Sequence, residues 1–259
     1  MPAPDRFGVM ATLDDIEVMA RLPVDFLELL VRANDTPAQI DRLLSAFDGE
    51  IILHAPELIT WHGGTSLLDL AAEEGLRDAS VARLQEVADA ARDHAVPMVV
   101  HPGGVLERAV PPGPLLERLE RSLGELDGFF WLENMPRGYH RGHELWIANL
   151  MVGAEQMLQV QNLVDGFVLD TAHAYLSREE DGNGALQEMF TMLGDNVRHV
   201  HLSDAAYPHQ EGLPLGWGEV DLTRVPRGRG LPILLEIQGG HENAGEGFRA
   251  ALRFIGRKA

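Results

Sequence analysis

Short apolar runs recur along the chain, and six of them end in a histidine or a carboxylate. Phe167-Val168-Leu169, for example, leads directly into Asp170, and its apolar positions are continuous rather than alternating. Such a run is typical of a strand that is buried on both faces. Most of the runs continue into a loop that contains proline or glycine. The residues at the six strand ends are His54, His101, Glu133, Asp170, His201 and Glu236.

Amphipathic segments alternate with these runs. The clearest is 80–94, where Val81, Leu84 and Val87 recur at helical spacing. Thr36 followed by Pro37 is typical of a helix start. The pattern predicts strands at 7–10 and 26–30, helices at about 12–21, 36–47, 80–94, 114–126, 143–161, 184–193 and 246–255, a short helix near 221–225, and loops at 57–75 and 205–218.

Repeated strand–helix units with buried strands indicate a parallel sheet. About eight such units in 259 residues match the size of a TIM barrel, so we expect an α/β fold, a single (β/α)8 barrel domain over residues 1–259. A doubly wound open sheet is the alternative, but no glycine-rich phosphate-binding motif follows the first strand. In a barrel, the carboxyl ends of all strands meet at one mouth. The six strand-end residues are therefore predicted to converge there.

Composition narrows the functional classes. The chain has no cysteine, so a metal site would use histidine, aspartate and glutamate. Its formal net charge is −19 and its only lysine is Lys258, which makes attraction to nucleic acid poor without excluding a local basic patch. Neither an apolar signal segment nor a membrane-spanning stretch is evident, and we expect a cytoplasmic protein without membrane contact.

Histidines and carboxylates without sulfur suit Zn²⁺, Mn²⁺ or Co²⁺ better than Mg²⁺. The alternative is a buried polar network without metal. Several carboxylates and imidazoles at one mouth would then repel one another or shift their pKa values strongly. Strand alternation places His199 and His201 on the same face. His201 is closer to the strand end and is the predicted ligand, whereas His199 is expected one layer deeper in the barrel.

Motifs at these strand ends carry a family resemblance. They are H-A-P at His54, H-P-G at His101, L-E-N at Glu133, D-T-A-H-A at Asp170, H-L-S-D at His201 and L-L-E at Glu236. From about 51 to 240, the chain resembles the xylose isomerase-like TIM barrels. That superfamily contains endonuclease IV (AP endonuclease family 2) as well as ketose epimerases and sugar isomerases. The motifs do not separate these branches.

The resemblance implies a metal that both branches share. Its ligands would be Glu133, Asp170, His201 and Glu236. The resemblance also implies a second metal, as in endonuclease IV, held by His54 and His101 with Glu133 as the bridging ligand. One or two ions are therefore expected.

A third metal position of endonuclease IV is only partly matched. His173 and His209 occupy the equivalent positions, but the aspartate that precedes the second histidine is missing from Tyr207-Pro208-His209. We expect this third position to be empty, or filled only at high metal concentration. In addition, Glu57 stands where endonuclease IV has its DNA-inserting tyrosine.

The first function that follows is a divalent-metal-dependent isomerase or epimerase of a sugar or sugar phosphate. Glu133 and Glu236 would transfer a proton next to the carbonyl of a metal-bound keto sugar. The mouth loops offer further substrate-binding candidates, although packed tryptophans and solvated arginines are more common. They are His173 for a hydroxyl oxygen, Trp61 and Trp217 for stacking on the sugar, and Arg137 for a phosphate.

The second function is phosphodiester cleavage at two metal ions. His54 and His101 favour it, whereas the overall charge and Glu57 disfavour it. A non-catalytic barrel with a structural metal is a third alternative, which we rank lowest because structural sites tend to be closed and these residues line a mouth. We favour the isomerase or epimerase with a sugar-like small molecule as its partner. A homo-oligomer is compatible with the sequence.

Overall fold

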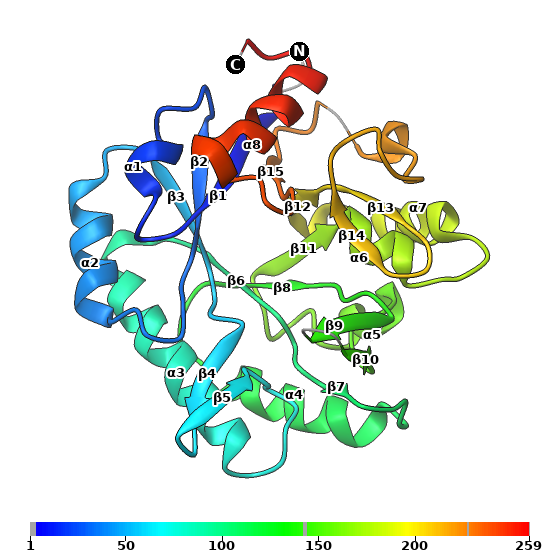
Figure 1. Ribbon diagram of the computed structural model, residues 1–259. Coiled ribbons are helices and arrows are strands. Elements are labelled where there is room, and N and C mark those ends of the chain that lie inside the picture. The colour runs from blue at the N-terminus through cyan, green and yellow to red at the C-terminus, as the bar shows by residue number, and fades with distance from the viewer. Residues whose placement is uncertain (1–3, 142–143, 227, 259) are drawn as a thin grey trace.

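The computed structural model describes residues 4–141, 144–226 and 228–258. Within them, eight parallel strands close into a barrel with helices along its outside (Figure 1), which confirms the predicted TIM barrel fold. In spatial order the strands are β1 (Arg6–Ala11), β15 (Pro232–Leu235), β12 (Val197–Leu202), β11 (Gly166–Asp170), β8 (Phe130–Glu133), β6 (Met98–Val100), β3 (Glu50–His54) and β2 (Phe26–Leu30).

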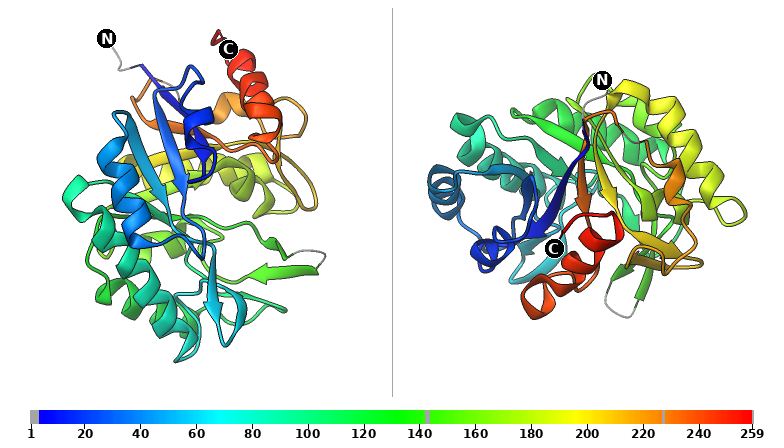
Figure 2. Two further views of the ribbon diagram at one scale, coloured as in Figure 1. Left: turned by 60° about the vertical axis from the view of Figure 1, so that its left-hand side comes forward. Right: turned by 90° about the horizontal axis from the view of Figure 1, so that it is seen from above.

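The helices cover the strands with one apolar face each, and Figure 2 shows them surrounding the barrel when it is seen from above. In the helix that follows β6, the buried Leu115, Leu119 and Leu123 are four residues apart, which is the spacing of a single helix face. The α-helices are α1 (Ile16–Met19), α2 (Pro37–Ala46), α3 (Leu76–Ala91), α4 (Gly113–Glu125), α5 (Ala154–Gln159), α6 (Thr171–Leu176), α7 (Gly182–Leu193) and α8 (Glu242–Phe254). Short 3-10 helices lie at Arg92–His94, Gly194–Asn196 and Leu222–Arg224.

The start of α2 agrees with its sequence signature. Thr36 is the N-cap, and its side chain and that of Gln39 each accept a hydrogen bond from the other residue's backbone N–H, which forms a capping box. Pro37 occupies the first turn, where a missing N–H costs nothing. The predicted helix start is confirmed. No helix in the described part of the chain is long and apolar enough to cross a membrane.

Three small antiparallel sheets follow the carboxyl ends of barrel strands, and they build the walls of the mouth. The loop predicted at 57–75 contains a hairpin, and so does the loop predicted at 205–218. The sheets are β4 (Leu58–Trp61) with β5 (Gly64–Leu67), β13 (Asp204–Ala206) with β14 (Gln210–Leu213), and β7 (Val105–Leu106) with β10 (Glu144–Ala148) and β9 (Gly138–Arg141).

The helix predicted over 143–161 is wrong. Its expected first residue, His143, lies outside the described residues, and 144–148 form β10, which pairs with both β7 and β9. Only Ala154–Gln159 is helical. The side chain of Asn149 holds this arrangement, because it accepts from the Val110 N–H at 2.8 Å and donates to the Gly104 carbonyl at 3.2 Å. A tertiary pairing has overridden the local apolar pattern.

Candidate metal centre

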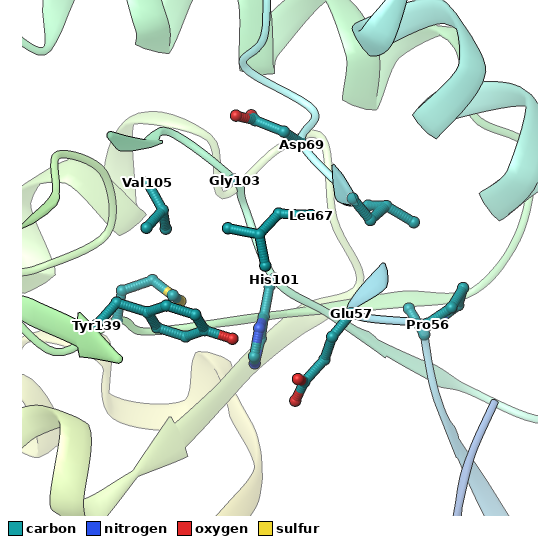
Figure 3. A pocket seen from close by; sticks show the side chains of 11 residues that line it. Pro56, Glu57, Leu67, Asp69, His101, Gly103, Val105 and Tyr139 are labelled. Atoms are coloured by element: carbon teal, nitrogen blue, oxygen red, sulfur yellow. The ribbon is translucent and has the colours of Figure 1, made fainter. Parts of the chain in front are cut away.

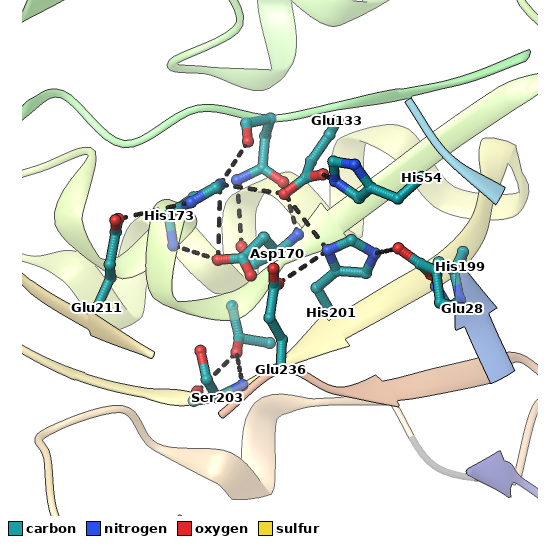
Figure 4. Close-up of polar contacts among 12 residues, drawn as sticks. Glu28, His54, Glu133, Asp170, His173, His199, His201, Ser203, Glu211 and Glu236 are labelled. Atoms are coloured by element: carbon teal, nitrogen blue, oxygen red, sulfur yellow. Dashed lines mark hydrogen bonds and ion pairs between the residues drawn. The ribbon is translucent and has the colours of Figure 1, made fainter. Parts of the chain in front are cut away.

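The six strand-end residues converge at the barrel mouth. Figure 4 labels all of them except His101. His54, Glu133 and Asp170 are the last residues of their strands, His201 is the last but one, and His101 and Glu236 directly follow theirs. Two groups result, in each of which the potential ligand atoms lie within 4.8 Å of one another. The groups are His54–His101–Glu133 and Glu133–Asp170–His201–Glu236.

Glu133 belongs to both groups. Its Oε2 lies 3.2 Å from His101 Nε2 and 3.7 Å from His54 Nε2. Its Oε1 lies 3.5 Å from His201 Nδ1, on the side of the second group. The side chain is only 1% exposed, so its orientation is fixed by the surrounding protein. A carboxylate that turns one oxygen to each group has the arrangement of a bridging ligand.

Asp170 caps a helix as well as facing the second group. Its Oδ1 accepts a hydrogen bond from the backbone N–H of His173 at 2.5 Å, which caps α6. Its own backbone N–H donates to Asn134 Oδ1 at 2.7 Å, and the Asn134 amide donates to the Asp170 carbonyl at 3.1 Å. Asp170 therefore combines the capping of α6 with its position in the second group. His173, in the same helix, is buried.

Sequence reasoning missed Glu28. This residue of β2 is fully buried, and its Oε2 lies 2.7 Å from His199 Nε2 while its Oε1 lies 3.2 Å from His201 Nε2. His199 is also held from its other side, where Nδ1–H donates to the Pro232 carbonyl at 2.9 Å. His199 thus lies one layer deeper than His201, as expected. Glu28 Oε1 faces His201 Nε2 at ion-pair distance, so the other ring nitrogen, Nδ1, is turned to the mouth. Outer carboxylates orient metal-binding histidines in this way.

Backbone carbonyls orient two further imidazoles in the same way. His54 Nδ1–H donates to the Ala55 carbonyl at 2.8 Å, which leaves Nε2 facing Glu133. His173 Nδ1–H donates to the Asn134 carbonyl at 2.9 Å, and its Nε2 lies 3.6 Å from Glu211 Oε2. In each ring the hydrogen bond fixes the tautomer and presents a lone pair to the mouth.

The loop that carries His101 is anchored by a buried carboxylate. Asp69 Oδ1 accepts hydrogen bonds from the backbone N–H of Gly104 at 2.9 Å and of Ala71 at 2.8 Å. Gly103 has φ of 78°, and a Cβ there would come within 2.1 Å of Asp69 Oδ1. Only glycine allows both this left-handed backbone and this close approach. The glycines after His101 therefore place the ligand loop against its anchor.

The donor set fits a divalent cation. In the described part of the chain, several buried side-chain atoms have no hydrogen-bond partner. Some belong to Glu28, Arg77, Arg83 and Trp131, but four are potential ligand atoms of the two groups, namely Glu133 Oε1 and Oε2, His201 Nδ1 and Glu236 Oε2. Leaving a buried polar atom unsatisfied costs about 1–3 kcal/mol, so four of them together call for a ligand between them. Imidazole nitrogens and carboxylate oxygens without sulfur suit Zn²⁺, Mn²⁺ or Co²⁺.

The pKa values of the clustered residues also indicate a site for a cation. Burial raises the pKa of Glu133, but the nearby His201 and His101 outweigh it and hold that pKa well below its usual range. Burial likewise opposes the charged form of His54, yet the nearby carboxylates of Glu133 and Glu28 raise the pKa of this imidazole to about 9. Without metal, protons on the histidines balance the carboxylates. A cation would replace those protons.

Protein stripped of metal should therefore lose stability as the pH rises. His54 has its pKa raised from 6.5 to about 9, so its contribution is complete below 6.5 and is lost as pH passes 9. Glu28, with a pKa lowered from 4.5 to about 2, contributes above 4.5 and loses that contribution as pH falls towards 2. The site should therefore stabilise the metal-free protein most between pH 4.5 and pH 6.5. As the pH rises above that window, we expect the free energy of unfolding to fall by on the order of 3 kcal/mol.

Thermal unfolding between pH 4 and 9, in chelator and in excess Mn²⁺ or Zn²⁺, measures this directly. Stabilisation by the added metal should instead grow with pH, because binding requires neutral imidazoles. A chelated protein whose melting temperature stays constant or rises from pH 6.5 to 9 would contradict the proton-balanced cluster.

A cavity of about 360 Å³ opens at this mouth. Its walls come partly from the hairpins, through Tyr139 and His140 of β9 and Glu211 of β14. Burial, with the nearby Glu57 and Glu211 charges, raises the pKa of Tyr139, which therefore stays a neutral hydroxyl. No arginine or lysine is present among the described residues that line the cavity. Tyr139, His140 and Glu211 were not anticipated from the sequence, where they lie between the predicted strands and helices.

The other predicted substrate contacts lie elsewhere. Trp61 packs its ring 4.2 Å from that of His62 and next to Gly75, and Trp217 is 78% exposed outside the cavity. Arg137 and His209 line a neighbouring groove. His173 lines the mouth cavity but faces Glu211 rather than His209. Among the described residues, neither His173 nor His209 belongs to a group of side chains that could hold a metal ion.

Comparisons with known proteins agree with this architecture. The solved structure of endonuclease IV from Thermus thermophilus superposes with a TM-score of 0.69 at 20% identity, over 96% of this chain and 98% of that one. A D-tagatose 3-epimerase-like protein gives 0.68 at 20% identity, with coverage of 96% and 98%. D-allulose 3-epimerase from Methylomonas sp. gives 0.64 at 17% identity, with coverage of 98% and 99%. These likenesses show the fold and do not distinguish the reactions.

Sequence comparison is consistent with the structures. Among curated proteins, none is significantly similar to this chain. The family model described as xylose isomerase-like TIM barrel matches residues 16–257, which includes every residue of the two metal-type groups. The chain therefore belongs to the xylose isomerase-like TIM barrel family.

Proposed function

We propose that the protein is a divalent-metal-dependent isomerase or epimerase of an unphosphorylated keto sugar. The observation that carries the proposal is the composition of the mouth cavity. Glu236 and other residues of the two groups of potential metal ligands line it together with side chains that can bind hydroxyl groups. The described lining residues include no arginine or lysine. A phosphate in this cavity would face Glu57 and Glu211 without an arginine or lysine to hold it. A neutral polyol meets no such penalty.

Proton transfer is assigned to Glu133 and Glu236. They reach the cluster from opposite sides in Figure 4, and both lie close to His201 Nδ1, Glu236 Oε2 at 2.9 Å and Glu133 Oε1 at 3.5 Å. Burial raises the pKa of Glu236, but His201 outweighs it, so the carboxylate is ionised and able to accept a proton at neutral pH. One carboxylate removes the proton next to the substrate carbonyl, and the other returns one.

A bound divalent ion, held by Glu133, Asp170, His201 and Glu236, would supply Lewis-acid polarisation of the carbonyl. The chain's own groups orient the sugar. His173 Nε2 and the neutral Tyr139 hydroxyl face the cavity and can hydrogen-bond to substrate hydroxyls. Substrate-positioning contacts of this kind hold the reacting carbon at the proton-transferring carboxylate.

Phosphodiester hydrolysis is the second candidate, and one observation favours it. His54, His101 and Glu133 form a complete second ligand group, which a single-metal isomerase does not need. Against it stand the net charge of −19 and the acidic lining of the mouth, since binding to a nucleic-acid backbone depends on cationic contacts.

Metal analysis and a substrate panel separate the two. We expect one tightly bound ion per chain by elemental analysis, and turnover of an unphosphorylated ketose at a higher kcat/KM than that of its phosphate. The same preparation, loaded with Mn²⁺, Co²⁺ or Zn²⁺, is incubated with abasic duplex DNA. Efficient metal-dependent nicking of that DNA, with two or three ions bound, would overturn the proposal in favour of hydrolysis.

A further inference from the structure

We infer that the substrate ends in a methyl group, a terminally deoxygenated ketose, and that a small side cavity beside His101 receives that methyl. The inference rests on the proposed function, because it names the substrate class of the same site. The side cavity is defined by its apolar wall, which consists of Ala55, Pro56, Leu67, Leu68, Val105 and Met135.

The side cavity is continuous with the mouth. Glu57, His101 and Tyr139 line both spaces, so they form the rim between them. In Figure 3 the His101 ring, the Tyr139 hydroxyl and the Glu57 carboxylate come together on one side of the cavity, with Leu67 and Val105 beyond them. A sugar chain that is bound at the metal-type groups therefore reaches the side cavity past His101.

The volume of the side cavity limits what it can bind to one small group. The volume is about 20 Å³, compared with about 360 Å³ for the mouth. Room for a single water molecule takes roughly 10–15 Å³, so the side cavity admits only a small terminal group of the sugar. The lining of the side cavity then decides between a methyl and a hydroxymethyl group.

The apolar lining of the side cavity favours a methyl group over a hydroxyl group or a water molecule. A buried water needs two to four polar partners. Asp69 is the one charged residue of the lining away from the rim, but its Oδ1 already accepts from Gly104 and Ala71, and Figure 3 shows the carboxylate turned away from Leu67 and His101. Beyond the rim, the side chains that remain are apolar. A hydroxyl inserted there would lose its hydrogen bonds to water.

The test compares three ketoses of matched configuration on the metal-loaded enzyme: a methyl-terminated ketohexose, the hydroxylated ketohexose, and the ketopentose that lacks the terminal carbon. We expect the methyl-terminated sugar to have the highest kcat/KM, by about 10- to 100-fold over each of the others, the range by which an apolar pocket discriminates one methylene or hydroxyl. Calorimetric Kd values for the same three sugars are measured in parallel.

Two variants test whether the preference for the methyl-terminated sugar depends on the side cavity. Val105→Leu fills the side cavity and should remove the preference, so that the ketopentose becomes the better substrate. Val110→Leu is the matched control, because Val110 lies outside the side-cavity lining, and it should keep the preference. Metal content and melting temperature, measured for both variants, identify any loss of folding.

The outcomes distinguish the inference from the proposed function. Turnover without a preference for the methyl-terminated sugar, or a preference that Val105→Leu leaves unchanged, overturns the inference and keeps the isomerase. Tighter binding of the methyl-terminated sugar without turnover of any ketose supports the inference and overturns the isomerase. Absence of both binding and turnover overturns both.

Discussion

Replacing Glu236 with glutamine is expected to lower kcat on a ketose about 10²- to 10⁴-fold, the usual contribution of a positioned acid or base. The amide keeps the shape and one acceptor oxygen but cannot take up a proton at neutral pH. The barrel should remain folded, because the Glu236 side chain is 32% exposed at the mouth and is not part of the core. Steady-state kinetics and circular dichroism measure the two effects.

Metal content has to be measured beside the rate, since Glu236 Oε2 also faces the second group. If the loss of activity is fully explained by lost metal and is restored by excess metal, Glu236 is a ligand only. Glu242→Gln provides the matched control, because this exposed residue begins α8 a few positions later and does not line the mouth cavity. Its kcat should equal that of the unchanged protein.

Replacing Glu28 with glutamine is expected to weaken metal binding about 10- to 100-fold, as loss of an outer carboxylate does for other metal-bound histidines. The carboxylate lies between His199 and His201 with no exposure, and its negative charge raises the pKa of His201. A glutamine keeps the shape but removes this charge, which lowers the basicity of the His201 imidazole. Competition against a chelator of known affinity gives the change in Kd.

A purely structural role would lower the melting temperature without altering metal affinity, so both are measured. The exposed Glu17 on α1 serves as the control position, since its glutamine variant removes the same charge far from His201. Unchanged metal affinity in a folded Glu28→Gln protein would refute the orienting role. Preserved affinity in the control and reduced affinity in Glu28→Gln would support it.

The barrel and most of the candidate metal centre were predictable from the sequence because strand-end placement is a local feature. His54, Glu133 and Asp170 each follow an unbroken apolar run, and parallel strands bring such ends to one edge. Glu28 was not predicted, although Phe26-Leu27-Glu28-Leu29-Leu30 places a carboxylate inside an apolar strand. A buried charge requires a partner, but the partner His199 is 171 positions away.

The mouth itself was the least predictable part. Tyr139 and Glu211 lie on hairpins whose pairing depends on contacts with other loops, such as that of β10 with β7. The local apolar pattern around Leu145, Trp146 and Ile147 is equally compatible with a helix, and only the pairing decides between the two. The side chains that line the walls of the mouth therefore depend on tertiary pairing, whereas the candidate metal ligands could be identified from the ends of the strands.

The pairing of β1 with β15 also has a consequence for biosynthesis. These two strands are the first and last of the chain, and Phe7 lies opposite Ile233, so the ring closes only when the C-terminal segment is available. Glu236 directly follows β15 and His201 lies on its neighbour β12. A nascent chain on the ribosome therefore lacks the complete second group, although the residues of the first group, at β3, β6 and β8, have already been made. High-affinity metal capture would then mark completed ring closure, a slow step because it joins such distant segments.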